Sequence, residues 1–68
     1  MGEGEYVSVL GWKLRRGARV RVTLRIYRSA VSEEGEVEGA TPALLVLRRS
    51  DGRRVAVRIS EIMIIEEV

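Results

Sequence analysis

The chain has 68 residues with 12 basic and 10 acidic side chains, a net charge of +2, and neither cysteine nor histidine. These absences exclude disulfides, thiolate chemistry and ordinary zinc sites, so stability must come from packing, strand pairing or association between copies. We expect a single domain over residues 1–68, flexible in residues 1–5, because a chain of this length supports only one small core.

The charges form blocks along the chain. Residues 13–28 carry seven positive charges and no negative one, residues 33–38 carry four glutamates, and residues 48–58 carry five arginines against Asp51. Such blocks predict faces of opposite sign after folding, suited to a polyanion or to self-association. The charged fraction of 32% and the absence of asparagine and glutamine suit a thermophilic source.

The first apolar segment is Tyr6–Trp12. Its valines and aromatic residues favour a short strand, although Val7, Leu10 and Leu14 would also share one face of a helix. The glycine within the segment weighs against the helix. We therefore expect a strand, followed by a turn at Arg15-Arg16-Gly17.

The strongest strand signal covers residues 17–28, where apolar and polar side chains alternate. One face comprises Val20, Val22, Leu24 and Ile26, and the other comprises Arg19, Arg21, Thr23, Arg25 and Tyr27. A strand of this length in so short a chain must bend and serve two sides of a small closed sheet.

The segments that follow are less regular. We expect Ser29–Glu34 to be a polar loop that closes the first hairpin. Gly35–Ala40 is expected to be a short strand with Val37 inward, ended by Thr41-Pro42 because proline cannot donate to a strand ladder. Ala43–Arg49 is apolar on both faces, as expected of a strand buried on both sides or lying at a subunit contact.

Ser50-Asp51-Gly52 predicts a hairpin turn. A three-residue loop pairs Leu47 with Val55 and keeps one face apolar, whereas a two-residue loop would pair Leu47 with Ala56 and mix core with surface. The same register places arginines opposite each other, Arg48 with Arg54 and Arg49 with Arg53. These side chains either splay into water or form a clamp for phosphate, and we favour the clamp because Arg58 extends the same hairpin.

The chain continues with a strand over Val55–Ile59, a tight turn at Ser60-Glu61 and a last strand over Ile62–Glu66. If Ile62 and Ile64 point to the core, the opposite face of this strand is apolar too, which natural edge strands avoid unless a partner covers them. We expect a second copy to cover it and to build a ring. The predicted interface comprises Ile62, Met63, Ile64, Ile65, Leu44 and Val46. The alternative is a monomer in which Tyr6–Trp12 folds over the last strand.

Five strands in this order, with a one-turn corner before the last, describe an all-β, SH3-like small barrel of five to six strands. Over about residues 17–67 the spacing resembles the archaeal-type Sm-like (LSm) family. Its first motif is matched by Gly17-x-x-Val20-x-Val22-x-Leu24, Gly35-x-Val37 and Leu45-x-Leu47. Its second motif is matched by Arg58-Ile59-Ser60-Glu61-Ile62-Met63-Ile64-Ile65, with Ile59 in place of the family's glycine.

The resemblance implies an RNA-binding barrel, but the family's uridine pocket does not carry over. Its Asp and Asn would fall near Thr41 and near Leu44 or Leu45, where neither residue type occurs. The pattern also looks like the C-terminal barrel of the ribosome maturation factor P family, in which an aliphatic residue at Ile59 would be normal.

These patterns predict a non-enzymatic protein without a catalytic residue, metal site or cofactor, because no side chain is placed to activate a hydroxyl and the glutamates of residues 33–38 suit a solvated surface. We expect RNA, with DNA as an alternative, to bind an arginine-rich surface with little sequence readout, alongside ribonucleoprotein partners. The candidate contacts are Arg48, Arg49, Arg53, Arg54 and Arg58, with a second patch of Arg19, Arg21, Arg25 and Tyr27. The competing functions are a structural or adapter barrel in a ribosome-associated complex, and a DNA-binding, chromatin-type barrel.

No apolar run exceeds strand length, so we expect no membrane span and a cytoplasmic location.

Overall fold

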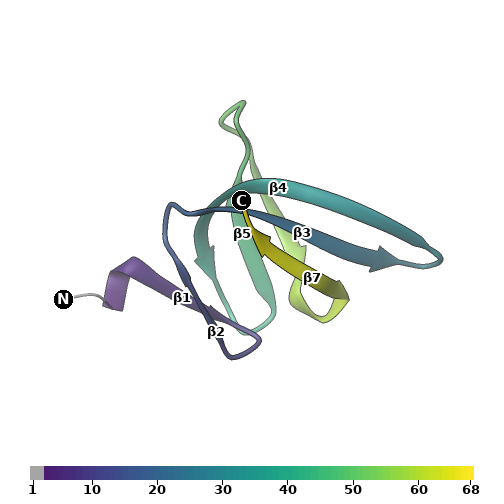
Figure 1. Ribbon diagram of the computed structural model, residues 1–68, viewed down its shortest axis with the longest axis horizontal. Coiled ribbons are helices and arrows are strands. Elements are labelled where there is room, and N and C mark those ends of the chain that lie inside the picture. The colour runs from purple at the N-terminus through teal and green to yellow at the C-terminus, as the bar shows by residue number, and fades with distance from the viewer. Residues whose placement is uncertain (1–2) are drawn as a thin grey trace.

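The computed structural model describes residues 3–68 (Figure 1). Two 3-10 turns, η1 and η2, and seven strands account for most of the chain. In order they are η1 (Glu3–Glu5), β1 (Tyr6–Val9), β2 (Trp12–Arg15), β3 (Arg19–Ile26), β4 (Ser29–Ala40), β5 (Leu44–Arg48), β6 (Arg54–Arg58), η2 (Ile59–Glu61) and β7 (Ile62–Glu67). Residues 1–2 of the predicted flexible segment lie outside the described residues.

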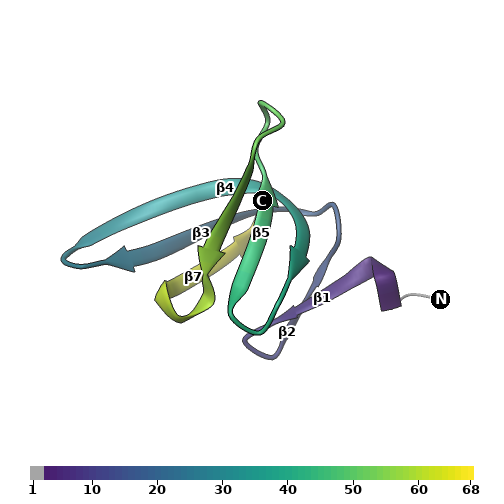
Figure 2. The ribbon, with the colours of Figure 1, turned by 180° about the vertical axis from the view of Figure 1, so that it is seen from behind.

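The strands form two antiparallel sheets. The larger sheet has the order β6-β5-β4-β3-β7, so β6 and β7 are its edges, and β1 pairs with β2 in a separate hairpin. The 12-residue β4 runs from the projecting β3–β4 hairpin over the body of the molecule to β5, as the view from behind shows (Figure 2). The predicted all-β, small barrel-like fold is confirmed.

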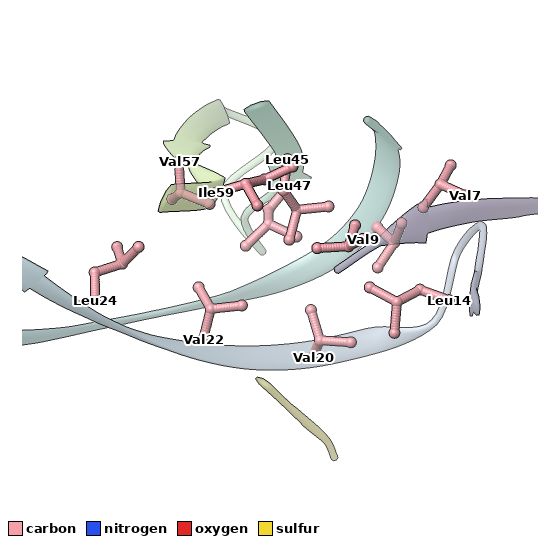
Figure 3. Packing of buried hydrophobic residues seen from close by; sticks show 11 residues of the cluster. Val7, Val9, Leu14, Val20, Val22, Leu24, Leu45, Leu47, Val57 and Ile59 are labelled. Atoms are coloured by element: carbon pink, nitrogen blue, oxygen red, sulfur yellow. The ribbon is translucent and has the colours of Figure 1, made fainter. Parts of the chain in front are cut away.

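The core lies between β3 on one side and β5, β6 and η2 on the other (Figure 3). Eleven apolar side chains form it, and none of the buried side chains among the described residues is polar. They are Val7, Val9, Leu14, Val20, Val22, Leu24, Val37, Leu45, Leu47, Val57 and Ile59. The apolar face predicted for β3 therefore lines one side of the core from Val20 to Leu24. Ile26, at the end of the strand, lies outside the core and is 44% exposed.

The first hairpin differs from the prediction. Residues 29–34 are strand rather than loop, and the turn is Tyr27-Arg28, with φ of 58° at Tyr27. The polar segment is strand because its backbone pairs with residues 21–26 of β3. Its glutamates also meet arginines, Glu33 with Arg49 after β5 and Glu34 with Arg19 of β3. Tyr27 consequently lies at the tip of the hairpin and not on the arginine face of β3.

The N-terminal segment is a hairpin and not a single strand. Leu10 and Gly11 form a two-residue loop with φ of 56° and 77°, as type I′ turns require. The resulting hairpin directs Val7, Val9 and Leu14 into one end of the core (Figure 3). The hairpin therefore covers one end of the core. The expected strand conformation, rather than helix, is confirmed for Tyr6–Val9 and Trp12, whereas Leu10 and Gly11 form a turn.

Two local features fix the middle of the sheet. Gly35 of β4 crosses β5 so closely that a Cβ there would lie 2.6 Å from the carbonyl oxygen of Arg48. The β5–β6 hairpin has the predicted three-residue register, with Leu47 opposite Val55 and φ of 86° at Gly52.

The last strand contains a β-bulge that the sequence did not reveal. Thr23 pairs with Ile64 and Leu24 pairs with Ile62, so Met63 is an extra residue in the ladder. Ile62 and Ile65 consequently pack against the core, while Met63 and Ile64 are about half exposed. The predicted inward position of Ile64 and outward position of Ile65 are wrong for this reason.

Among the described residues, no helix has both the length and the apolar character needed to cross a membrane.

Candidate nucleic-acid interface

The outer face of β3 is a basic row between two acidic strands. Arg19 contacts Glu34 at 3.0 Å, and Arg21 contacts Glu34 at 3.4 Å and Glu66 of β7 at 3.7 Å. The hydrogen bond from Arg19 and the nearby positive charges hold the pKa of Glu34 below its ordinary value. The charge blocks of the sequence thus meet across strands and neutralise each other, instead of forming the predicted faces of opposite sign.

The facing arginines of the β5–β6 hairpin also have carboxylate partners. Arg48 and Arg54 lie opposite each other, and both contact Glu38 of β4, at 2.7 Å and 3.1 Å. Arg49 reaches both carboxylate oxygens of Glu33 at 3.0 Å. Glu38 therefore offsets the repulsion between Arg48 and Arg54. Because Arg48, Arg49 and Arg54 each contact a glutamate, they do not form the empty phosphate clamp that the sequence predicted.

Three of the eight predicted arginines have no ion-pair partner among the residues that the structure describes: Arg25, Arg53 and Arg58. Arg25 precedes the tip of the β3–β4 hairpin, Arg53 follows the β5–β6 turn, and Arg58 ends β6. Within the same described part, Arg28, Lys13 and Arg15, which the sequence did not single out, are likewise outside every ion pair.

A groove of about 530 Å³ separates the far half of the β3–β4 hairpin from β6 and η2. Its apolar surface is formed by Leu24, Ile26, Val31, Val55 and Val57. Tyr27, which is 94% exposed, lies at one end, and Arg58 and Glu61 contribute from the β6–η2 corner. The structure thereby joins Tyr27 and Arg58, which were predicted for separate patches.

The groove lies between an edge strand, β6, and the projecting end of the β3–β4 hairpin. β6 has no strand partner on its outer side, and the projecting hairpin carries the apolar face of β3 and β4 beyond the core (Figure 1). Ile26 and Val31 are 44% and 37% exposed there. Such a concave apolar surface with a few polar groups is typical of ligand sites.

The corner that carries Arg58 and Glu61 is fixed by backbone hydrogen bonds. The N–H of Ile59 donates to the carbonyl of Ala43 at 2.9 Å, the N–H of Ile62 donates to the carbonyl of Ile59, and the Ile59 side chain is buried. Glu61 was not predicted as a site residue, because nothing in the sequence places it beside the hairpin tip.

A second hollow of about 520 Å³ lies beside the N-terminal hairpin. Its basic residues Arg15, Arg16 and Arg48 are matched by Glu5, Glu36 and Glu38. Arg16 also donates to the backbone carbonyls of Gly4 and Glu38, so it serves to attach η1 to β4. This hollow is balanced in charge and apolar contacts are few, which makes it a weaker candidate than the groove.

The six residues predicted for the oligomer interface fall into an exposed group and a half-buried group. Leu44, Met63 and Ile64 are exposed to 38%, 49% and 50%, whereas Val46, Ile62 and Ile65 are half-buried within the domain. β7 is an edge strand, as expected, so its exposed apolar residues lie beside unpaired backbone groups.

Comparisons of the chain with protein-family models, curated proteins and solved structures find no match. Among the described residues, no three carboxylate, imidazole or thiol side chains come together as a metal-ligand cluster.

Proposed function

We propose that this domain binds single-stranded RNA, with little dependence on sequence, through the groove between Tyr27 and Arg58. The observation that carries the proposal is the meeting of an almost fully exposed aromatic ring, an apolar floor and an arginine outside every described ion pair. Stacking of a base on an aromatic side chain contributes about 1–3 kcal/mol, and every base offers a face for it. A base that leaves a single strand can enter such a groove, whereas a base in a duplex cannot.

Phosphate contacts supply the remaining affinity. Arg28 follows Tyr27 in the β3–β4 turn, and Arg58 lies at the far side of the groove. Arg25 alternates with the groove-lining Leu24 and Ile26, so it lies on the opposite face of β3. The arginines on the outer face of β3 contribute less, because binding a phosphate there would displace Glu34 or Glu66. With about two phosphate contacts, the affinity should fall about sevenfold between about 50 and 200 mM salt, because the logarithmic slope for single strands is about −0.7 per contact.

The experiment is fluorescence anisotropy with a labelled RNA of about ten nucleotides. The variant Tyr27→Ser with Arg58→Gln removes both rims of the groove and should weaken binding about tenfold or more. Its matched control is Tyr6→Ser with Arg15→Gln, since this cross-strand pair on the N-terminal hairpin also combines an exposed tyrosine with an arginine outside the described ion pairs. The control should lose less than about threefold.

Two results would reject the proposal. If both variants lose the same affinity, the basic charge of the whole surface binds RNA and the groove does not. If the unmodified protein binds no RNA at low salt, the adapter function predicted as the alternative takes its place.

We also propose that a second copy covers the β7 edge. The supporting observation is the exposed pair Met63 and Ile64 on a strand without an outer partner. Pairing of one β7 with another would satisfy the free backbone groups. A closed ring would need the β6 edge as well, and the neighbour's strand would then occupy the groove. A ring and groove-bound RNA therefore exclude each other, and we take the assembly as a pair.

A further inference from the structure

Few charged side chains line the groove, and they include both positive and negative charges. Arg58 and Glu61 both line it, and neither takes part in an ion pair with another described residue. A third charged residue, Glu33, also lines the groove, but its two oxygens already accept hydrogen bonds from Arg49. A ligand in the groove therefore meets one free guanidinium and one free carboxylate.

Arg58 and Glu61 can form only one kind of hydrogen bond each with a ligand. A guanidinium only donates, and an ionised carboxylate only accepts. Both groups belong to the η2 corner, which the buried Ile59 and its hydrogen bond to Ala43 hold in place. The donor and the acceptor are therefore presented on a rigid element and not on a mobile loop.

We infer that the groove selects guanine at the one position where a base enters it, while the rest of the strand is bound without regard to sequence; this inference rests on the proposed RNA-binding function. Guanine offers two adjacent donors, N1–H and the N2 amino group, to the carboxylate of Glu61. Its O6 and N7 accept from a guanidinium such as that of Arg58, which is the commonest specific contact between arginine and a base. Its large ring system also suits stacking on Tyr27 over the apolar floor.

The other bases fit this pair less well. Uracil has one donor, N3–H, between two carbonyl oxygens, so a carboxylate placed against it meets two acceptors. Adenine and cytosine each have one amino group but present an acceptor nitrogen beside it. Only guanine places two donors side by side on the edge that the carboxylate of Glu61 would face.

The test uses an oligouridine strand of about nine nucleotides whose central position is guanine, adenine, cytosine, uracil or inosine, which lacks the N2 amino group. We expect the guanine strand to bind about tenfold tighter than the uridine strand, with inosine in between. Glu61→Gln should reduce the guanine-to-uracil ratio below about threefold, because the amide no longer accepts with both terminal atoms. Glu67→Gln, which removes an exposed carboxylate from β7 outside the groove, should retain the full ratio.

The outcomes separate this inference from the proposed function. If all five strands bind the unmodified protein equally, or if inosine equals guanine, guanine selection is rejected while RNA binding stands. If no strand binds, both fail together. Competition with free GMP tests whether the groove binds guanine as a free nucleotide or only within an RNA strand. GMP lacks flanking phosphates and should not compete at about 100 times the dissociation constant of the guanine strand. Competition by GMP at that concentration would show a free-nucleotide site and overturn selection within RNA.

Discussion

Replacement of Gly35 by alanine tests the close crossing of β4 and β5 in the middle of the sheet. A Cβ at this position would lie 2.6 Å from the carbonyl oxygen of Arg48, 3.1 Å from its carbonyl carbon and 3.2 Å from Cβ of Leu47. Two of these atoms are backbone, so β4 and β5 must move apart by roughly 0.8 Å to restore an ordinary contact of about 3.4 Å. The predicted result is a folded but destabilised protein.

The magnitude follows from two opposing effects. Overpacking of this kind costs about 1–3 kcal/mol, and the gain in strand preference of alanine over glycine offsets about 0.5–1 kcal/mol of it. The expected net loss is about 1–2 kcal/mol, a large share of the roughly 3–10 kcal/mol available to a domain of this length. In thermal unfolding this corresponds to a decrease in Tm of about 4–16 °C.

Gly39→Ala on the same strand is the matched control. Its added Cβ would meet only the end of the flexible Arg16 side chain, at 3.5 Å, so Tm should stay the same or rise slightly. Both variants are followed by circular dichroism at one protein concentration, because self-association would shift Tm by mass action. Equal Tm values for Gly35→Ala and the unmodified protein, or equal losses in both variants, would refute the close crossing of β4 and β5.

Three further outcomes are expected. Met63→Glu with Ile64→Lys should convert a dimer into a folded monomer, as measured by light scattering, and a monomeric unmodified protein at tens of micromolar would contradict the β7 contact. Because the pKa of Glu34 is lowered in the folded state, its contribution to stability is present above its ordinary pKa of 4.5 and is lost as the pH falls through the folded value. The urea midpoint should therefore fall on acidification from about pH 7 to about pH 3 less steeply in Glu34→Gln than in the unmodified protein, and equal slopes would speak against this ion pair. Glu38→Gln should lower stability by a few tenths of a kcal/mol to about 1 kcal/mol, because two facing arginines lose their shared carboxylate, and should leave RNA affinity nearly unchanged, because neither arginine lines the groove; a clear gain in affinity would place the RNA at the β5–β6 hairpin instead.

The second half of the fold was predictable because local signals agreed there. The turn at Ser50-Asp51-Gly52 shows where the hairpin closes. The alternate positions that are apolar in the flanking strands match only in the register that pairs Leu47 with Val55. The first hairpin was not predictable in the same way. Tyr27 and Arg28 are not typical turn residues, and the polar residues 29–34 give no strand signal of their own before β3 is beside them.

The sequence predicted several residues of the candidate site but not how the fold brings them together. The sequence predicted the arginines and Tyr27 as candidate contacts, but alternation placed Tyr27 on the arginine face of β3 and not at the hairpin tip. The sequence also does not show which arginines will meet a glutamate across the sheet. It also does not show the bulge at Met63, because a register shift depends on the partner strand. The groove requires the length of the β3–β4 hairpin, which brings Tyr27 to Arg58 across about 30 residues of sequence.

The most direct test of the groove as the RNA site is a titration of the ¹⁵N-labelled protein with a short single-stranded RNA, followed by amide chemical shifts. The proposed function predicts the largest shifts in residues 24–31 and 55–61, which form the groove, and small shifts in residues 6–15 of the N-terminal hairpin. Largest shifts in residues 6–15, or on the ion-paired outer face at residues 19–23 and 64–67, would contradict it.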